Sequence, residues 1–260
     1  MSRFLPLIAL TVFLIYSCAK TSTQGSSDVP MDLYQAQRFF IRGQLHFKQK
    51  EYKKAVQDFN KSIQSNPRAL APYVLRGLAY TAINEYQKAE RDFSYVIPKL
   101  PPGKGWDIYF FRGNCYTFLK KYPKAIEDYS VAIGLNPKNG ILYNNRADAY
   151  LVTGQYAKAL RDANRAVGLL PKNPIVYLTR GEIYIQQKKY KKAIKDINKS
   201  IKLDPKKATS YLKRGEAYSH LNNCAGVKDY KSYLKLKMNI TPREKSDIEV
   251  RIQDLTKRCG

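Results

Sequence analysis

Residues 174–207 read PIVYLTRGEIYIQQKKYKKAIKDINKSIKLDPKK, and this stretch carries the pattern that decides the fold. Counted from Pro174, a Tyr stands at position 4, an Arg-Gly pair at positions 7 and 8, an Ala at position 20 and a Pro at position 32. The Pro at position 32 would end a helix, because its ring clashes with the preceding turn and it has no N–H to donate.

The same pattern recurs along most of the chain. Arg followed by a small residue stands at Arg42, Arg76, Arg112, Arg146, Arg180 and Arg214, and the interval is constant except between Arg76 and Arg112, where it is two residues longer. This period resembles the tetratricopeptide repeat, in which two antiparallel helices form each unit of about 34 residues. The resemblance covers six repeats, 36–69, 70–105, 106–139, 140–173, 174–207 and 208–240. It implies an all-α fold, a right-handed α-solenoid of six helical hairpins whose stacking supplies the core.

Two features of the repeat have a structural interpretation. Gly or Ala at position 8 and Ala at position 20 would lie where the two helices of a hairpin cross, because a larger side chain would hold the backbones apart. An Asp follows each Arg at a fixed interval, as Asp196 follows Arg180, and the interval is one residue shorter only in the last repeat. A row of Arg could bind phosphates or carboxylates. We favour ion pairs between the helices of each hairpin, since these satisfy both partners.

Composition narrows the class of protein. The 260 residues include 46 Lys and Arg against 21 Asp and Glu, a formal net charge of +25, and 44% are hydrophobic. These values exclude a wholly disordered chain, a collagen and a polytopic membrane protein. No nucleophile with a base and no metal-ligand spacing is apparent, and His46 and Cys115 are expected to be core residues. We expect neither an enzyme nor a bound cofactor or metal.

The first residues, MSRFLPLIALTVFLIYSC, are typical of a secretion signal. The uncharged run 4–16 would form a helix of about 20 Å, which is too short to span a membrane. Its end, Ile15-Tyr16-Ser17-Cys18, resembles the bacterial lipobox. That resemblance implies a signal peptide of residues 1–17 and lipidation of Cys18; the alternative is an ordinary signal peptide cut nearby. Residues 18–35, which include a stretch rich in Ser, Thr and Gly, would then form a flexible tether.

These features predict a protein that is lipid-anchored in the bacterial cell envelope. Ala19 follows the lipidated residue and favours the outer membrane, facing the periplasm, because an Asp there retains many lipoproteins at the inner membrane.

Two further segments depart from the repeat. Residues 101–106, PPGKGW, lengthen one loop by two residues and hold the only Trp. Trp106 could cover the start of the next helix or offer a partner an exposed anchor, and we favour the first. Residues 241–260 begin Thr-Pro-Arg-Glu, the signature of a helix start, and place Ile248, Ile252 and Leu255 on one face. We expect a helix that caps the last repeat.

The concave groove of such a solenoid is the expected binding surface. By the resemblance, it is lined by positions 2, 5, 9, 12 and 13 of the first helices. Position 5 is mostly apolar, and position 9 becomes acidic towards the C-terminus. Apolar groups beside carboxylates suit a peptide that carries Lys or Arg, although Glu182 and Glu216 could simply pair with neighbours such as Lys213. The expected groove residues are Phe40, Gln44, Phe110, Asn114, Asn144, Asp148, Leu178, Glu182 and Glu216.

The predicted function is therefore a scaffold that binds peptide segments of other envelope proteins. The basic excess offers an alternative function, in which the convex face binds anionic wall polymer or lipid headgroups. Residues 188–207 alone hold nine Lys against two Asp. The preference for Lys over Arg, and export from the cytoplasm, argue against nucleic acid as the partner. A homo-oligomer is compatible with the sequence.

Cys224 and Cys259 are expected to form a disulfide. Cys224 replaces the Tyr found at position 17 of the other repeats, at the tip between two helices, and Cys259 stands at the end of the capping helix. If that helix packs where a seventh first helix would lie, its end approaches the same tip. An exported chain sits where disulfides persist. Otherwise, Cys224 would be a small filler in a Tyr position.

Overall fold

The computed structural model describes residues 31–259. The predicted signal peptide, the predicted lipidation site Cys18 and most of the predicted tether lie outside the described residues. The described residues form thirteen α-helices and one 3₁₀ helix, η3 (Ile97–Lys99), and contain no strand. The α-helices are α2 (Met31–Lys48), α3 (Tyr52–Ser65), α4 (Leu70–Ala82), α5 (Tyr86–Val96), α6 (Trp106–Phe118), α7 (Tyr122–Leu135), α8 (Gly140–Val152), α9 (Tyr156–Leu169), α10 (Pro174–Gln186), α11 (Tyr190–Leu203), α12 (Ala208–Ser219), α13 (Ala225–Leu236) and α14 (Pro242–Cys259).

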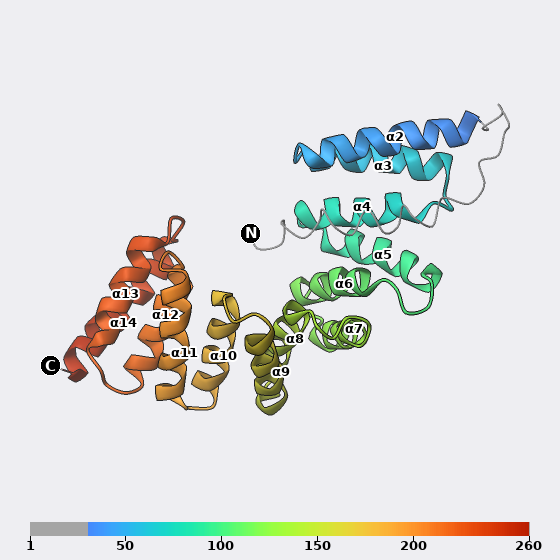
Figure 1. Ribbon diagram of the computed structural model, residues 1–260. Coiled ribbons are helices and arrows are strands. Elements are labelled where there is room, and N and C mark those ends of the chain that lie inside the picture. Colours follow the sequence, from blue (N-terminus) through green and yellow to red (C-terminus); the bar gives the residue numbers. More distant parts are fainter. Residues whose placement is uncertain (1–30, 260) are drawn as a thin grey trace. The chain divides into compact units, whose positions relative to one another are not determined.

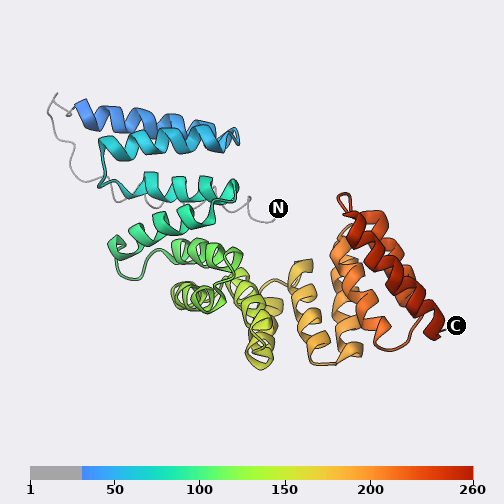
Figure 2. The ribbon, with the colours of Figure 1, turned by 180° about the vertical axis from the view of Figure 1, so that it is seen from behind.

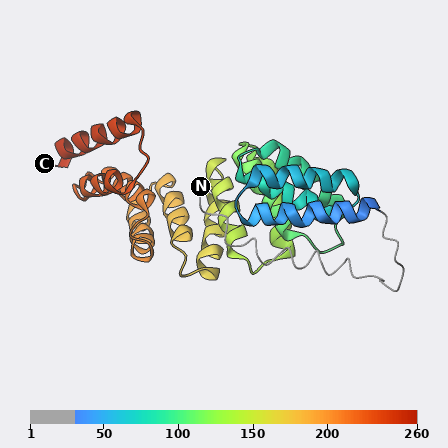
Figure 3. The ribbon, with the colours of Figure 1, turned by 90° about the horizontal axis from the view of Figure 1, so that it is seen from above.

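The helices pack as consecutive hairpins, which confirms the all-α fold. Six pairs form, from α2 with α3 to α12 with α13, and α14 packs against α13 (Figure 1). Figure 2 shows the same pairs from behind, and Figure 3, from above, shows α2 and α3 side by side. Among helices of the described residues, none combines the length and apolar character needed to cross a membrane.

The described helices divide into two compact units between Asn136 and Pro137. Unit 1 contains α2–α7, and its core includes the fully buried rings of Phe59 and Phe93. Unit 2 contains α8–α14, and α10 in its middle packs against α9 and α11 as well as against the first helices α8 and α12. Within each unit, stacking therefore covers faces that a single hairpin would expose.

The first helix begins earlier than the sequence predicts. Residues 31–35 were expected in the tether, but α2 starts at Met31. Asp32 lies in its first turn, where a helix dipole stabilises a carboxylate. The guanidinium carbon of Arg38 lies 5.7 Å from the centre of the Tyr34 ring, one turn along the helix. Local contacts of this kind extend the helix beyond the repeat pattern, which the period alone could not indicate.

The tight turn between the two helices of every hairpin uses one left-handed residue. Position 15 has a φ between 51° and 75° in all six repeats, and Gly or Asn, the residue types that favour this conformation, stands there in only three of them. These are Asn84, Gly154 and Asn222, and the other three repeats have Lys50, Lys120 and Lys188. Packing of the hairpin thus imposes a backbone conformation that residue types alone do not predict.

The small residue at position 8 lies closest to the side chain at position 24 of the same repeat, a partner that the sequence did not indicate. A Cβ atom added to Gly113 would lie 2.7 Å from Cε1 of Tyr129. Rings or an isoleucine face the glycine in the same way in four other repeats. In the fourth repeat, both positions are Ala, Ala147 and Ala163, and both are fully buried. The two positions therefore share one volume, which their residues fill in different proportions.

Each Arg at position 7 forms a bidentate ion pair within its own hairpin, as predicted. In the third repeat, Nε and Nη2 of Arg112 donate to the two carboxylate oxygens of Asp128 at 2.8 and 2.7 Å. The Asp is buried in all six repeats. In the fifth repeat, the hydrogen bond with Asp196 raises the pKa of Arg180. The structural interpretation of the Arg row is confirmed.

The same Arg side chains also join neighbouring hairpins, a contact that the sequence did not predict. Nη1 of Arg76 donates to Oδ1 of Asn60 in the preceding repeat at 2.7 Å, and Arg214 contacts Asn198 in the same way at 2.7 Å. The Tyr at position 4 makes a second link, since the hydroxyl of Tyr177 donates to the carbonyl of the preceding Pro171 at 3.1 Å. These groups hold neighbouring hairpins of the same unit in register.

The predicted capping helix is confirmed as α14. The hydroxyl of Thr241 accepts a hydrogen bond from the N–H of Glu244 at 3.2 Å, as an N-cap residue does. Ile248 and Leu255 are buried against α13, and Ile252 is half-buried beside them. Half-buried Trp106 opens α6, at the place where it was expected to cover a helix start.

Candidate functional site

The predicted groove residues separate into a buried set and a surface set. The residues at position 5 that were expected to face a ligand, together with Asn114 of position 9, are only 4–8% exposed and belong to the core. Phe40 and Leu178 belong to core clusters that include residues of the next hairpin, and this packing is not visible in the repeat pattern. The buried set consists of Phe40, Phe110, Asn114, Asn144 and Leu178.

The two buried asparagines have different surroundings. Oδ1 of Asn114 accepts a hydrogen bond from the hydroxyl of Tyr129 at 2.8 Å, so this side chain braces the third hairpin. Oδ1 of Asn144 has no hydrogen-bond partner among the described residues, a condition that costs about 1–3 kcal/mol for a buried acceptor. Asn114 is therefore structural, and burial removes Asn144 from the predicted binding surface.

The surface set is concentrated in unit 2 and is acidic. Asp148, Glu182 and Glu216 occupy position 9 of α8, α10 and α12 and are half-buried, as is Gln44 on α2 in unit 1. α10 contacts both α8 and α12, so the three carboxylates lie on neighbouring first helices of one unit. The alternative that these acids pair with a neighbouring Lys is confirmed for Glu216, because its carboxylate lies 3.2 Å from the Nζ atom of Lys213.

Apolar side chains beside these carboxylates come from positions 2 and 13, which the repeat resemblance places in the groove but whose residues were not among the expected site residues. Ile141 and Ile175 stand at position 2 of α8 and α10, seven residues before Asp148 and Glu182, and both are half-buried. Val152, four residues after Asp148, is 54% exposed. Spacings of seven and four return to the same face of a helix, so these residues share a face with the acids. Positions 2 and 13 thus replace position 5 as the apolar part of the surface.

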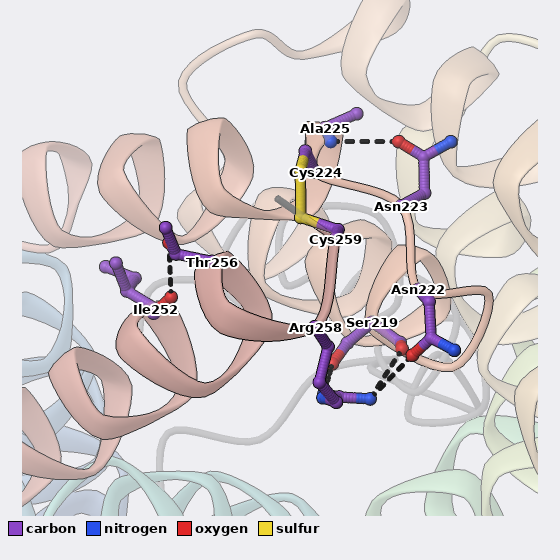
Figure 4. The surroundings of a disulfide bond; sticks show 9 residues. All are labelled: Ser219, Asn222, Asn223, Cys224, Ala225, Ile252, Thr256, Arg258 and Cys259. Carbon is purple, nitrogen blue, oxygen red and sulfur yellow. Dashed lines mark hydrogen bonds between the residues drawn. A yellow bond between two sulfur atoms is a disulfide. The ribbon is translucent and has the colours of Figure 1, made fainter.

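The structure joins Cys224 and Cys259 in a disulfide, with their Cα atoms 5.6 Å apart (Figure 4). Cys224 precedes α13 and Cys259 ends α14. Beside the bond, Nη1 of Arg258 donates to Oδ1 of Asn222 at 2.8 Å, and Nη2 donates to the hydroxyl of Ser219 at 3.0 Å (Figure 4). The end of α14 is therefore tied to the tip of the last hairpin by a covalent bond and by hydrogen bonds.

The remaining chemical candidates are held in structural contacts. Cys115 is a free, buried thiol, and burial raises its pKa to about 12. His46 was expected in the core, but it is only half-buried. Its Nδ1 atom lies 2.7 Å from a carboxylate oxygen of Glu51, and its Nε2 atom lies 3.7 Å from a carboxylate oxygen of Asp58. No group of three potential metal ligands occurs within residues 31–259.

Three segments of the chain match models of the tetratricopeptide repeat family, residues 36–69, 106–139 and 181–221. A comparison with curated proteins found no match. Solved structures provide further evidence. A tetratricopeptide repeat protein from Parabacteroides merdae superimposes with a TM-score of 0.73 at 16% identity, over 87% of this chain and 90% of that chain.

Two other solved structures have the same fold. The C-terminal part of a TPR repeat-containing protein from Cytophaga hutchinsonii has a TM-score of 0.63 at 18% identity, over 85% of this chain and 93% of that chain. YrrB, described as a TPR protein with an unusual peptide-binding site, has a TM-score of 0.59 at 17% identity, over 67% of this chain and 89% of that chain. The matched segments identify tetratricopeptide repeats in three parts of the chain, and these structures share its fold.

Proposed function

We propose that the chain is a protein-interaction scaffold that binds basic peptide segments on the first-helix surface of unit 2. One observation carries the proposal: carboxylates stand at position 9 of three neighbouring first helices, with apolar side chains on the same helix faces. This arrangement contrasts with the formal charge of +25 on the whole chain. An acidic surface on a basic protein selects for cationic ligands and disfavours the acidic ones that the rest of the chain would attract.

The chemistry of the surface defines the ligand class. Asp148 and Glu182 would accept hydrogen bonds from Lys or Arg side chains, and charge-assisted bonds of this kind are stronger than neutral ones. Ile141 and Ile175 would contact aliphatic side chains between those charges. Because the carboxylates belong to successive hairpins, a bound segment would run from helix to helix along the unit. This role is one of binding and requires no catalytic group.

The family supports a role in protein binding. Stacked helical hairpins present extended surfaces to partners, and YrrB, which has a similar fold, is described as having a peptide-binding site. We further propose that the partners are envelope proteins and that the scaffold is lipid-anchored through Cys18, in the outer membrane and facing the periplasm. Anchoring and location rest on residues 1–19 of the sequence.

A peptide selection tests the binding surface. A random library of short linear peptides is selected on the wild-type chain and on the triple variant Asp148→Lys/Glu182→Lys/Glu216→Lys. We expect Lys or Arg interleaved with Leu, Ile or Val on the wild type. The triple variant is expected to select Asp and Glu, because its surface charge is reversed. Recovery of the same basic peptides on both proteins would reject the proposal.

A charge-matched control separates the site from net charge. Glu127, Asp247 and Glu249 are exposed and lie outside the first helices. Their replacement by Lys changes the net charge by the same amount, and this variant should select the same peptides as the wild type. Both triple variants should keep the circular dichroism of the wild type, since half-buried or exposed positions typically move stability by about 0.5 kcal/mol each.

A further inference from the structure

All the exposed charged side chains of α11 are cationic. Five lysines are exposed on it, and their spacing keeps them within about one quarter to one third of the helix circumference, over about 17 Å of its length. The only carboxylate of the helix, Asp196, is turned inward, where Arg180 binds both of its oxygens at 2.6 and 2.7 Å. The exposed lysines are Lys191, Lys192, Lys195, Lys199 and Lys202.

The other two second helices of unit 2 repeat this arrangement. On α9 and on α13, the only carboxylates are Asp162 and Asp229, and each is buried in a pair with Arg146 or Arg214. No carboxylate is thus exposed on α9, α11 or α13, because the repeat uses its one Asp to hold the hairpin together. The exposed cations of these two helices are Lys158, Arg161, Arg165, Lys228, Lys231 and Lys235.

A pocket opens at the end of the lysine stripe on α11. It is lined by Lys188, Lys189, Tyr190, Lys191, Lys192 and Leu221. The ring of Tyr190 is stacked on His220 with the ring centres 4.6 Å apart, and Leu221 is 39% exposed. The pocket therefore brings lysine side chains together with an aromatic ring and an aliphatic side chain.

We propose that this cationic layer, formed by α9, α11, α13 and the loop before α11, docks on the surface of an anionic lipid bilayer. Lysines near such a surface are attracted to phosphate-bearing headgroups, and their contributions accumulate with number. Lys suits this contact because its ammonium is a compact charge on a flexible stem, whereas paired phosphate forks favour Arg. The surface shares no residue with the proposed peptide site, so the two proposals stand or fall separately.

The pocket favours a lipid surface over a soluble polyanion. A soluble polyphosphate or acidic polymer would use the ammonium groups alone. At a bilayer surface, Leu221 and the lysine stems can enter the region between headgroups and acyl chains while the ammonium groups stay with the phosphates. Tyr190 has the same amphipathic character, which is typical of residues at membrane interfaces.

Vesicle sedimentation of the full chain tests the docking surface. Phosphatidylcholine vesicles with and without phosphatidylglycerol are compared for two variants that remove equal charge at repeat positions 18, 19 and 26. Lys191→Gln/Lys192→Gln/Lys199→Gln should lower partitioning to the anionic vesicles at least tenfold. Lys53→Gln/Lys54→Gln/Lys61→Gln, at the same positions of the first repeat, should lower it less than twofold. Residues 1–30 are common to both proteins, so their contribution cancels.

Equal losses in the two triple variants would show that only net charge matters and would overturn the proposal. Equal partitioning of the wild type to both kinds of vesicle would also overturn it.

A second pair of variants distinguishes lipid from polymer. Leu221→Gln should weaken partitioning to anionic vesicles several-fold without changing binding of soluble polyphosphate, and Leu45→Gln, at an exposed leucine of unit 1, should change neither. Wild-type partitioning of Leu221→Gln would overturn the lipid assignment.

Discussion

At the scale of single residues, the hairpins depend on a volume shared between positions 8 and 24. In the third hairpin, the Tyr129 ring fills this volume, and its hydroxyl is held by Asn114 at 2.8 Å. The ring therefore cannot turn aside to admit a methyl group on Gly113. The fourth hairpin divides the same volume between Ala147 and Ala163. A substitution at one position is tolerated only if the other position gives up space.

We therefore expect Gly113→Ala to destabilise the protein by about 1–3 kcal/mol, as overpacking of a core does. Gly134→Ala, in the partner helix α7, is the control, because a Cβ atom there meets no heavy atom within 4 Å. It should be neutral or stabilising by up to about 1 kcal/mol, since Ala is a better helix former than Gly. Urea denaturation measures both. Equal stability of the two variants would contradict the steric explanation.

The double variant Gly113→Ala/Tyr129→Ala provides an internal check. It imitates the pair of alanines in the fourth hairpin, so its destabilisation should be smaller than the sum of the two single effects. A simple sum would mean that the two positions do not share a volume.

At the scale of an element, α14 is attached to the rest of unit 2 in two ways. Its apolar face covers α13, where Cδ2 of Leu255 would lie only 2.8 Å from a Cβ atom placed on Gly226. The disulfide between Cys224 and Cys259 then closes a loop with a sequence separation of 35 residues. By the chain-entropy model, a loop of this length is worth about 3–4 kcal/mol. The disulfide thus protects a terminal helix that could otherwise fray.

A thiol count tests this bond in a Cys18→Ala variant. The folded, non-reduced protein should not react with a maleimide, because Cys115 is buried and burial raises its pKa to about 12. After unfolding without reduction, one thiol should react, and after reduction three should react. Cys18→Ala/Cys115→Ala, as the control, should show no thiol before reduction. Three reactive thiols in the unfolded, non-reduced Cys18→Ala protein would exclude the disulfide.

At the scale of the whole molecule, the two proposed partners follow from the distribution of charge. The formal charge of +25 favours association with anionic surfaces in general. Within unit 2, the first helices add carboxylates, and the exposed charges of the second helices are all cationic. A single acyl chain at the N-terminus would by itself hold the protein at a membrane only weakly, because stable anchoring takes two signals. A cationic layer could supply an additional signal.

The anchor itself is tested at Cys18, which lies outside the described residues. Cys18→Ala should release the protein into the soluble periplasmic fraction or leave the precursor uncut, because the residue that takes the lipid is lost. Metabolic labelling with a fatty-acid analogue should mark only the wild type. Labelling of both proteins to the same extent would reject the lipobox interpretation and leave an ordinary signal peptide.

The sequence by itself determined the features that repeat. The regular period, the Pro at position 32 and the fixed interval between Arg and Asp predicted six hairpins and their internal ion pairs, because these are properties of each repeat taken alone. The Thr-Pro-Arg-Glu start and the apolar stripe of α14 were readable for the same reason, since caps and helix faces depend on a few neighbouring residues.

Only the tertiary structure decided which of the repeated positions reach the surface. Phe40 and Leu178 were expected in the groove but are covered by packed helices, whereas Ile141 and Val152 take that role. The pairing of positions 8 and 24 and the absence of an exposed carboxylate on α11 also emerged from packing. The physical reason is that burial depends on residues far away in the sequence, and a carboxylate such as Asp196 leaves the surface only when a neighbouring helix supplies its partner.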